Sequence, residues 1–175
     1  FMGQTLLLTG RPGVGKTTVI RQVARALDDL AGGFYTEEIR GSDGRRTGFR
    51  LITLNGQEGV MAHVALRGHG RPQVSRYGVD VSVIEEVGVA ALQQAMASAR
   101  VVIVDEIGKM ELFCDAFKET VEEAVRGEHR VLGTVMAGAH PWVDDLKDRE
   151  QVVVWEVTVI NRDELPKRIR RWMIR

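Results

Sequence analysis

The sequence predicts an α/β fold with three layers, in which helices cover both faces of a mostly parallel central sheet. Two observations lead to this prediction. First, short apolar segments alternate with segments of helical periodicity along the chain, the pattern of successive strand–helix units. Second, residues 101–104 are four consecutive β-branched residues, a composition typical of a strand buried on both faces of a parallel sheet.

The expected elements follow from these patterns in chain order. Strands are predicted at residues 5–9, 34–39, 47–54, 101–104, 130–136 and 152–159, with short glycine-punctuated strands within 57–81. Helices are predicted at residues 16–30, 82–98, 114–127, 143–149 and from 163 onward. Residues 31–33 are interpreted as the stop of the first helix, and Ser82 with Glu85 has the spacing of a capping box. Turn residues at 42–45 predict a hairpin insert, which adds antiparallel edge strands to the sheet.

Length and composition are those of one globular domain. Residues 2–175 are expected to form it, and Phe1, which precedes Met2, is interpreted as a cloning remnant. The 24 Lys and Arg residues balance 24 Asp and Glu residues, so no general basic field attracts nucleic acid or an anionic membrane. No apolar run approaches the roughly 18 residues of a membrane span, and a cytoplasmic location is expected. The single cysteine, Cys114, is expected to be a half-buried structural thiol.

A glycine-rich segment at residues 10–17 follows the pattern G-x-x-x-x-G-K-T, between the apolar run 5–9 and a helical segment. This order of strand, loop and helix is the context of a phosphate-binding loop. Glycines let successive backbone N–H groups converge on an anion, and the helix N-terminus adds unpaired donors. Lys16 can reach the β- and γ-phosphates, and the Thr17 hydroxyl can ligate Mg²⁺. The sequence therefore predicts a nucleoside di- or triphosphate bound by Gly10, Arg11, Pro12, Gly13, Val14, Gly15, Lys16 and Thr17.

The buried strand 101–104 ends in two carboxylates, Asp105 and Glu106. An apolar strand that delivers an aspartate to its carboxyl end is how P-loop proteins place a carboxylate beside Mg²⁺, usually through water. Thr17 and Asp105 are therefore the predicted metal ligands. A glutamate after this aspartate is typical of the RecA/ASCE-like branch of the P-loop fold, where it activates the attacking water. The alternative is that the pair caps the turn Ile107-Gly108 or that Glu106 forms a salt bridge.

Five further side chains are candidates for contact with the phosphates. Lys109 either binds phosphate oxygens or is a solvated surface lysine, and Thr134 either senses the γ-phosphate or is an ordinary sheet-end threonine. Phosphoryl transfer builds negative charge that an arginine commonly stabilises. Arg11, Arg149 and Arg162 are the candidates for this role, and a surface salt bridge is the alternative for each of them.

The C-terminal segment offers a second kind of contact. Asn161 and Arg162 follow the last predicted strand, near where the base of a nucleotide lies in this fold class, so they can frame the base. In the helix after them, Ile169, Trp172 and Met173 recur at helical spacing. This stripe is most simply a face that docks on the domain.

In both motifs, the chain resembles the P-loop nucleoside-triphosphatases found from thermophilic bacteria and archaea to humans. The human member of this family is called cancer-related nucleoside-triphosphatase. The matching stretches are residues 8–18, 33–39, 44–49, 77–80, 104–112, 132–134 and 157–162. The resemblance implies Mg²⁺-dependent hydrolysis of ATP, GTP and other nucleoside triphosphates, with broad tolerance of the base. It further implies nucleotide binding by the loop 10–17 and by Val101, Val102, Ile103, Val104, Asp105, Glu106, Ile107 and Gly108.

Hydrolysis is the leading hypothesis, with Lys16 and Glu106 as catalytic residues, and other functions stay open. A nucleotide or small-molecule kinase shares this fold, and the arginine-rich hairpin 34–54 can supply its closing lid. A guanine-reading Asn-Lys-x-Asp segment is absent, which argues against a GTPase switch. A nucleic-acid motor is disfavoured by the small, neutral domain. The expected partner is a nucleoside triphosphate, with no membrane and no nucleic acid; the oligomeric state is left open, and a monomer is compatible with the sequence.

Overall fold

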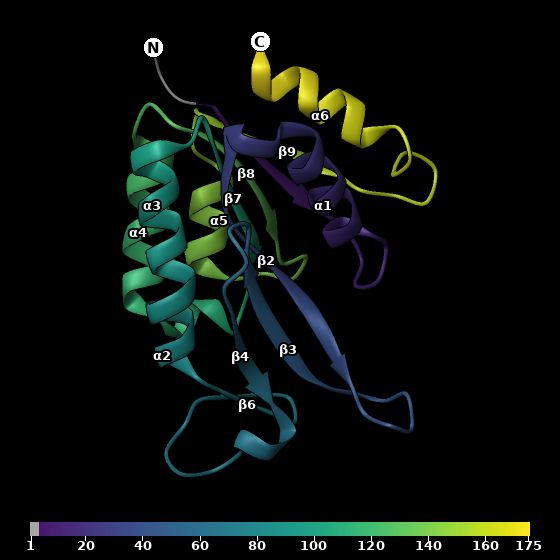
Figure 1. Cartoon of the computed structure of the whole chain (residues 1–175), viewed down its shortest axis with the longest axis vertical. Coiled ribbons are helices and arrows are strands. Elements are labelled where there is room, and N and C mark those ends of the chain that lie inside the picture. The colour runs from purple at the N-terminus through teal and green to yellow at the C-terminus, as the bar shows by residue number, and fades with distance from the viewer. Residues whose placement is uncertain (1–3) are drawn as a thin grey trace.

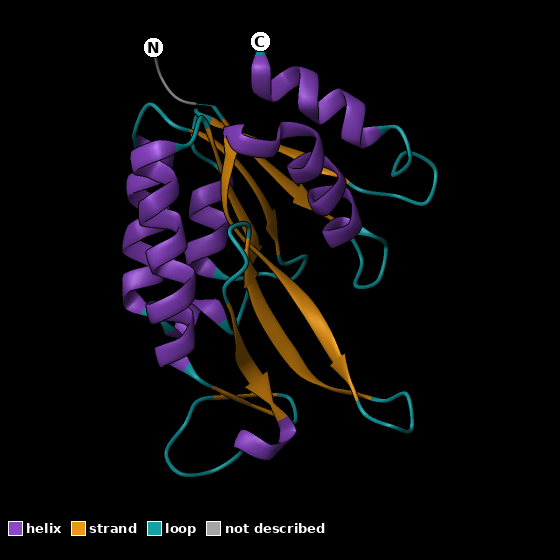
Figure 2. Ribbon diagram, in the orientation of Figure 1, coloured by secondary structure: helices purple, strands orange, loops and turns teal. Residues whose placement is uncertain are grey.

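A single sheet organises the computed structural model, which describes residues 4–175. Its strands are β1 (Thr5–Thr9), β2 (Ala31–Arg40), β3 (Arg46–Thr53), β4 (Glu58–His63), β5 (Gln73–Val74), β6 (Tyr77–Val79), β7 (Val101–Ile107), β8 (Arg130–Val135) and β9 (Val152–Glu156). Within the described residues they form one nine-stranded sheet in the order β5-β6-β4-β3-β2-β7-β8-β1-β9. Strands β2, β7, β8, β1 and β9 are parallel, whereas β3, β4, β6 and β5 are antiparallel. The predicted mixed sheet with antiparallel edge strands is confirmed (Figures 1 and 2).

Helices cover both faces of the parallel half of the sheet. They are α1 (Lys16–Leu27), α2 (Val81–Val83), α3 (Ala90–Ser98), α4 (Asp115–Arg126), α5 (Pro141–Lys147) and α6 (Leu165–Ile174). Helices α1 and α6 lie on one side, and α3 and α4 lie on the other (Figure 1). Each side has its own apolar cluster, one built with α1 and α6 and the other with α3, α4 and α5. The three layers expected from the sequence are therefore present. None of the described helices is long and apolar enough to cross a membrane.

Helix α6 packs on the domain through the stripe that the sequence indicated. Ile169 and Met173 are buried against the cluster of α1, and Trp172 packs edge-on against Trp155 at 6.4 Å between ring centroids. Burying such an aliphatic side chain contributes about 1.5–3 kcal/mol. The packing of α6 against α1 matters for the site, because it fixes the segment between β9 and α6 beside the loop that precedes α1.

Residues 31–33, predicted as a helix stop, instead begin β2. Helix α1 ends at Leu27, and Ala31 and Gly32 already pair with Val101 and Val102 of β7. Gly33 has a φ of +116°, and a Cβ at this position would lie 2.0 Å from the carbonyl oxygen of Ile103. The glycine is thus required by the close approach of two strands rather than by the end of a helix.

The helix predicted at 82–98 begins earlier and has a different cap. Asp80 accepts hydrogen bonds from the backbone N–H groups of Ser82 (3.1 Å) and Val83 (3.4 Å), so it is the cap in place of Ser82. A π-helical turn at Ile84–Val89 then joins α2 to α3. Smaller differences concern the ends of other elements: β7 continues to Ile107, β9 ends at Glu156, α5 starts at Pro141 and α6 starts at Leu165.

The topology brings three strand ends to one place. Strand β8 lies between β1, which precedes the glycine loop, and β7, which ends in the carboxylates. Because β1, β7 and β8 are parallel, their carboxyl ends meet at the same edge of the sheet. The antiparallel hairpin of β2 and β3 continues past that edge, because β2 runs on to Arg40 beyond its pairing with β7 (Figure 2).

Candidate functional site

The glycine loop between β1 and α1 has the geometry of an anion-binding loop. Gly10, Gly13 and Gly15 all have positive φ, and a Cβ on Gly10 would lie 2.7 Å from the carbonyl oxygen of Val157. Lys16 begins α1, and its Nζ donates to the carbonyl oxygen of Gly10 at 2.7 Å, so the side chain folds back over the loop. The ammonium group and the first N–H groups of α1 therefore belong to one compact cradle for an anion.

Asp105 is the centre of a buried hydrogen-bond network at the end of β7. Only 2% of the residue is exposed. One carboxylate oxygen accepts from the hydroxyl of Thr17 at 2.8 Å, and the other accepts from the hydroxyl of Thr134 at 2.6 Å. The backbone N–H of Thr36 on β2 adds a third donor at 3.4 Å. Donors from three elements, α1, β8 and β2, thus hold one carboxylate, and Thr134 is one of the two side chains that fix its orientation.

The surroundings of Asp105 fit a hard divalent cation. Burial raises the pKa of Asp105, and the hydroxyls of Thr134 and Thr17 oppose this rise without cancelling it. A nearby cation would supply the missing compensation for the buried negative charge. The donors here are a carboxylate and a hydroxyl, both oxygen ligands of the kind that Mg²⁺ takes. Among residues 4–175 no group of three or more His, Cys, Asp and Glu side chains gathers to form a metal cage, and Mg²⁺ usually binds through one or two protein ligands, phosphate oxygens and water.

Glu106 lies next to the lysine of the loop. One of its carboxylate oxygens is 3.9 Å from Nζ of Lys16, and 33% of its side chain is exposed. Burial raises the pKa of Glu106, the charge of Lys16 lowers it, and the charge of Asp105 raises it. A partly accessible carboxylate with a raised pKa beside the lysine of the glycine loop is a candidate general base.

A third carboxyl group, Glu111, was not identified from the sequence as part of this site. Only 4% of Glu111 is exposed, in the short turn Glu111–Phe113 after β7. A Cβ on Gly108 would lie 2.7 Å from an oxygen of Glu106 and 3.2 Å from an oxygen of Glu111, so both carboxyl groups border this glycine. Burial first, and the charge of Glu106 second, raise the pKa of Glu111 well above its ordinary value. Glu111 is therefore a buried carboxyl group that borders Gly108 together with Glu106.

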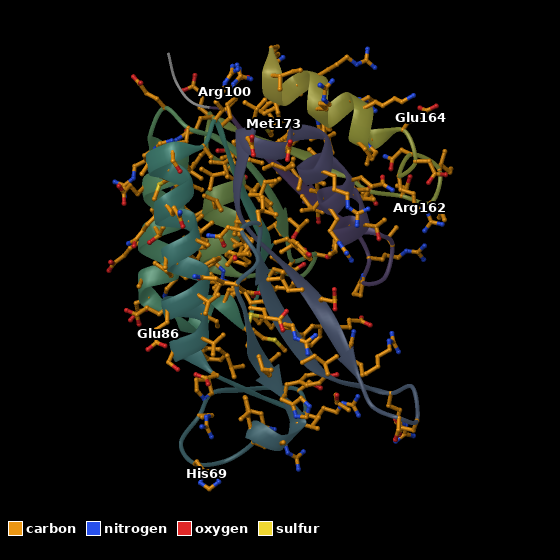
Figure 3. The ribbon with its side chains drawn as sticks, viewed as in Figure 1. His69, Glu86, Arg100, Arg162, Glu164 and Met173 are labelled. Carbon is orange, nitrogen blue, oxygen red and sulfur yellow. The ribbon has the colours of Figure 1, made fainter. Side chains whose placement is uncertain are left out.

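The segment between β9 and α6 lies along the other side of the glycine loop. The guanidinium of Arg162 donates to the carbonyl oxygen of Val14 at 3.1 Å. The side-chain amide of Asn161 is engaged within its own segment, accepting from the N–H of Thr158 and donating to the carbonyl of Glu156, both at 2.8 Å. Figure 3 shows Arg162 on the segment before α6, on the side of the molecule where α1 lies. Arg162 thus contacts the glycine loop directly, whereas Asn161 stabilises its own segment.

Three other candidates stand apart from this network. Arg149 forms a bidentate ion pair with Glu122 of α4, at 2.5 and 2.6 Å, and contacts Asp145 of α5 at 3.0 Å. This is the salt-bridge alternative, and it links α4 to α5 rather than contributing to the glycine loop. Lys109 is exposed in the turn after β7, and Arg11 is exposed on the loop itself. Of the three, Arg11 alone belongs to the glycine loop.

Comparisons with known proteins agree with this geometry. A model of the NTPase family matches residues 5–170. The chain belongs to the NTPase family. The nucleoside-triphosphatase THEP1 of Thermotoga petrophila is 46% identical over 164 residues, which cover 94% of this chain and 89% of the relative. The human cancer-related nucleoside-triphosphatase is 36% identical over 182 residues, which cover 94% and 93%.

A solved structure extends the similarity to three dimensions. The crystal structure of THEP1 from Aquifex aeolicus superposes with a TM-score of 0.88 at 34% identity, and the match covers 98% of this chain and all of that one. The predicted P-loop fold and the predicted family are confirmed, and this NTPase-family chain is an enzyme of the nucleoside-triphosphatase class.

Proposed function

We propose that the chain hydrolyses nucleoside 5'-triphosphates to the diphosphate and phosphate, with Mg²⁺ as cofactor and Glu106 as the base that activates water. One observation carries this proposal. Lys16, the Thr17–Asp105 hydrogen bond and Glu106 converge on the same sheet edge, although 88 residues separate Thr17 from Asp105. This adjacency supports the proposal, because phosphoryl transfer to water requires a phosphate cradle, metal ligands and a base close together.

The cradle acts first, by holding the phosphates. The N–H groups of the glycine loop point to the anion, and Lys16 exchanges the carbonyl oxygen of Gly10 for phosphate oxygens. Thr17 and Asp105 are the residues that would hold Mg²⁺, Asp105 through water. When bound, the cation neutralises charge on the phosphates. Thr134 keeps the carboxylate of Asp105 in the required orientation.

Glu106 then takes the proton of the attacking water. For this it must be ionised, and the positive charge of Lys16 favours the ionised form. Partial burial works in the opposite direction and makes the carboxylate a stronger base than a solvated one. Phosphates bound to Lys16 would lie close to Glu106, because the two side chains are 3.9 Å apart. We expect the attacking water to lie between the γ-phosphorus and Glu106, which accepts its proton as the water attacks.

The contacts of the hairpin argue against the kinase alternative. A phosphate-binding lid needs arginines that are free to close over the nucleotide. Arg40 and Arg46 instead pair with Glu38 at 2.6 and 3.0 Å, and Arg50 lies 3.9 Å from Glu37. These arginines are thus engaged with carboxylates of the hairpin itself.

Phosphate release separates hydrolysis from transfer to another acceptor. The experiment measures free phosphate and nucleoside diphosphate from ATP, GTP, CTP and UTP, with and without Mg²⁺, and with and without added nucleosides. We expect Mg²⁺-dependent release of one phosphate per diphosphate from all four substrates, unchanged by the nucleosides. Diphosphate formation that requires an added acceptor and yields no free phosphate would show that the chain is a kinase.

A further inference from the structure

Helix α6 concentrates positive charge on one part of the surface. Residues 165–175 contain basic side chains and no acidic one, although the whole chain has 24 residues of each sign. The basic side chains are all exposed: Lys167, Arg168, Arg170, Arg171 and Arg175. Among residues 4–175, none of them forms an ion pair with a carboxylate. The helix therefore presents a cluster of unpaired cations on a chain whose net charge is zero.

An open hollow of about 420 Å³ lies between this helix and the edge strand β9. Its lining consists of two tryptophans and three arginines: Trp155, Trp172, Arg168, Arg171 and Arg175. The guanidinium of Arg168 lies 5.0 Å from the centroid of the Trp155 ring, and that of Arg175 lies 4.7 Å from the centroid of Trp172. Aromatic rings and positive charges are thus in contact along one surface.

This combination of groups matches the chemistry of a single-stranded nucleic acid. Each nucleotide supplies a phosphate, which pairs with guanidinium groups. Each base is a flat ring that stacks on a tryptophan face or on a guanidinium plane, and this contact accepts every base. In a duplex the bases are stacked on one another, so a strand with free bases fits the hollow better than a duplex does.

Three other occupants fit the surface less well. A helix that lies on a membrane inserts its apolar face into the lipid, but Ile169 and Met173 of α6 are buried against the cluster of α1. A symmetric contact between two copies would bring the same arginines of both chains together, and like charges repel. An acidic peptide would pair with the arginines and would leave the indole rings without a planar partner.

We propose that the surface around this hollow binds a single-stranded nucleic acid, with the arginines on the phosphates and Trp155 and Trp172 against the bases. The balance of charge over the whole chain led to the expectation of no nucleic acid, but that balance averages this patch with acidic residues elsewhere. The surface does not include the glycine loop, so the inference does not rest on the proposed hydrolysis.

Tryptophan fluorescence reports binding, because two of the three tryptophans of the chain line the hollow. The full chain is titrated with a thymidine strand of about 12 nucleotides, and an abasic strand of equal length, which has phosphates and no bases, competes with it. We expect quenching by the thymidine strand and a Kd at least about 5-fold higher for the abasic strand, because stacking of even one base contributes this much. Raising NaCl from about 50 to 200 mM should raise Kd of the thymidine strand about 20-fold, as expected for three neutralised phosphates.

A double variant tests the arginines. Arg168→Gln with Arg171→Gln keeps helix-forming side chains and removes two cations, so we expect Kd at low salt to rise at least about 10-fold and its dependence on salt to fall by about two thirds. The matched control is Arg67→Gln with Arg71→Gln, two exposed arginines between β4 and β5. Figure 3 shows His69, which lies between them in the sequence, at the opposite end of the molecule from α6. This control loses the same charge and should bind as the wild type does, and thermal unfolding followed by circular dichroism shows whether both variants are folded.

Several results would overturn the proposal. They are the absence of binding by the thymidine strand, an equal Kd for the abasic strand, an equal loss in the two double variants, and equally tight binding of polyglutamate or of phosphatidylglycerol vesicles. A rise in molar mass by light scattering without nucleic acid, abolished by Arg168→Gln with Arg171→Gln, would instead assign the surface to contact between two copies. The comparison of the two strands uses the wild type, so it decides the matter even if a variant does not fold.

Discussion

Two regions that border the glycine loop are built in opposite ways. On the phosphate side, Asp105 is buried and accepts hydrogen bonds from two threonine hydroxyls and one backbone N–H, and Lys16 lies folded over its loop. On the side of the segment between β9 and α6, the tip consists of the exposed apolar residues Val159 and Ile160. One region fixes charges in place, and the other exposes two adjacent apolar side chains.

This difference between the two regions predicts which part of a substrate the protein distinguishes. Fixed charges stabilise the charge that develops on the phosphates, and their geometry is costly to alter. An apolar surface adds affinity and discriminates weakly between ligands of similar shape. Under the proposed function, selectivity is therefore expected to depend on the phosphates more than on the base. We expect substitutions of Glu106, Thr134 and Glu111 to have effects of decreasing size.

The largest effect is expected for Glu106→Gln, which keeps the size of the side chain and removes its basicity. We expect ATP to bind as before and the rate of phosphate release to fall about 10²- to 10⁴-fold, the contribution of a general base. Glu123→Gln, on the exposed face of α4, is the control for the loss of one charge and keeps full activity. Steady-state phosphate release and ATP binding measure the two effects separately. Release at the wild-type rate by Glu106→Gln would refute the assignment of the base.

A smaller effect is expected for Thr134→Val, which removes a donor from the buried Asp105 and conserves shape. The unfolding free energy should fall by about 1–3 kcal/mol, because a buried carboxylate oxygen loses its partner. The Mg²⁺ concentration for half-maximal activity should rise several-fold. Thr120→Val is the matched control: Thr120 is also buried, but its hydroxyl donates to the carbonyl of Ala116 within α4. An unchanged Mg²⁺ dependence in Thr134→Val would separate Thr134 from the metal site.

The smallest effect concerns Glu111 and depends on pH. Its pKa in the folded protein lies well above the ordinary value of 4.5, so over this interval the folded state binds more protons than the unfolded state. The unfolding free energy therefore falls as pH rises from 4.5 through the raised pKa. Glu111→Gln removes this cost, and we expect Tm to be higher than wild type at pH 8 and equal to it near pH 4.

At pH 8, each kcal/mol of unfolding free energy gained by the substitution should raise Tm by about 2–4 °C. Calorimetric scans between pH 4 and pH 8 measure it, and Glu119→Gln on the exposed surface of α4 controls for the change of net charge. A gain of the same size at both ends of the pH range would mean that the proton on Glu111 is not the cause.

The conformation of the glycine loop and the place of Asp105 at the end of β7 were predictable from the sequence, for a physical reason. Residues 10–17 and Asp105 carry signals that are local: glycines for positive φ, a β-branched run for a buried strand, and a carboxylate at its end. The parallel sheet then brings the two segments together, because strands of this kind end at one edge. The apolar stripe of α6 was predictable on the same grounds, since helical spacing is local.

What could not be predicted depends on contacts between distant segments. The engagement of Arg149 with Glu122, 27 residues away, follows from how α4 packs beside α5. The burial of Glu111 depends on how the turn after β7 folds back, and a carboxylate at this position reads as exposed in the sequence. Gly33 appears as a helix stop until the approach of Ile103 is known.

The central claim is that water is the phosphoryl acceptor, and isotope labelling tests it most directly. ATP is turned over in water enriched in oxygen-18, in the presence of Mg²⁺ and without any other acceptor, and the products are analysed by mass spectrometry. Attack of water on the γ-phosphorus predicts one labelled oxygen in each released phosphate and no label in ADP. Label in the β-phosphate of ADP, or no turnover until another acceptor is added, would contradict the account.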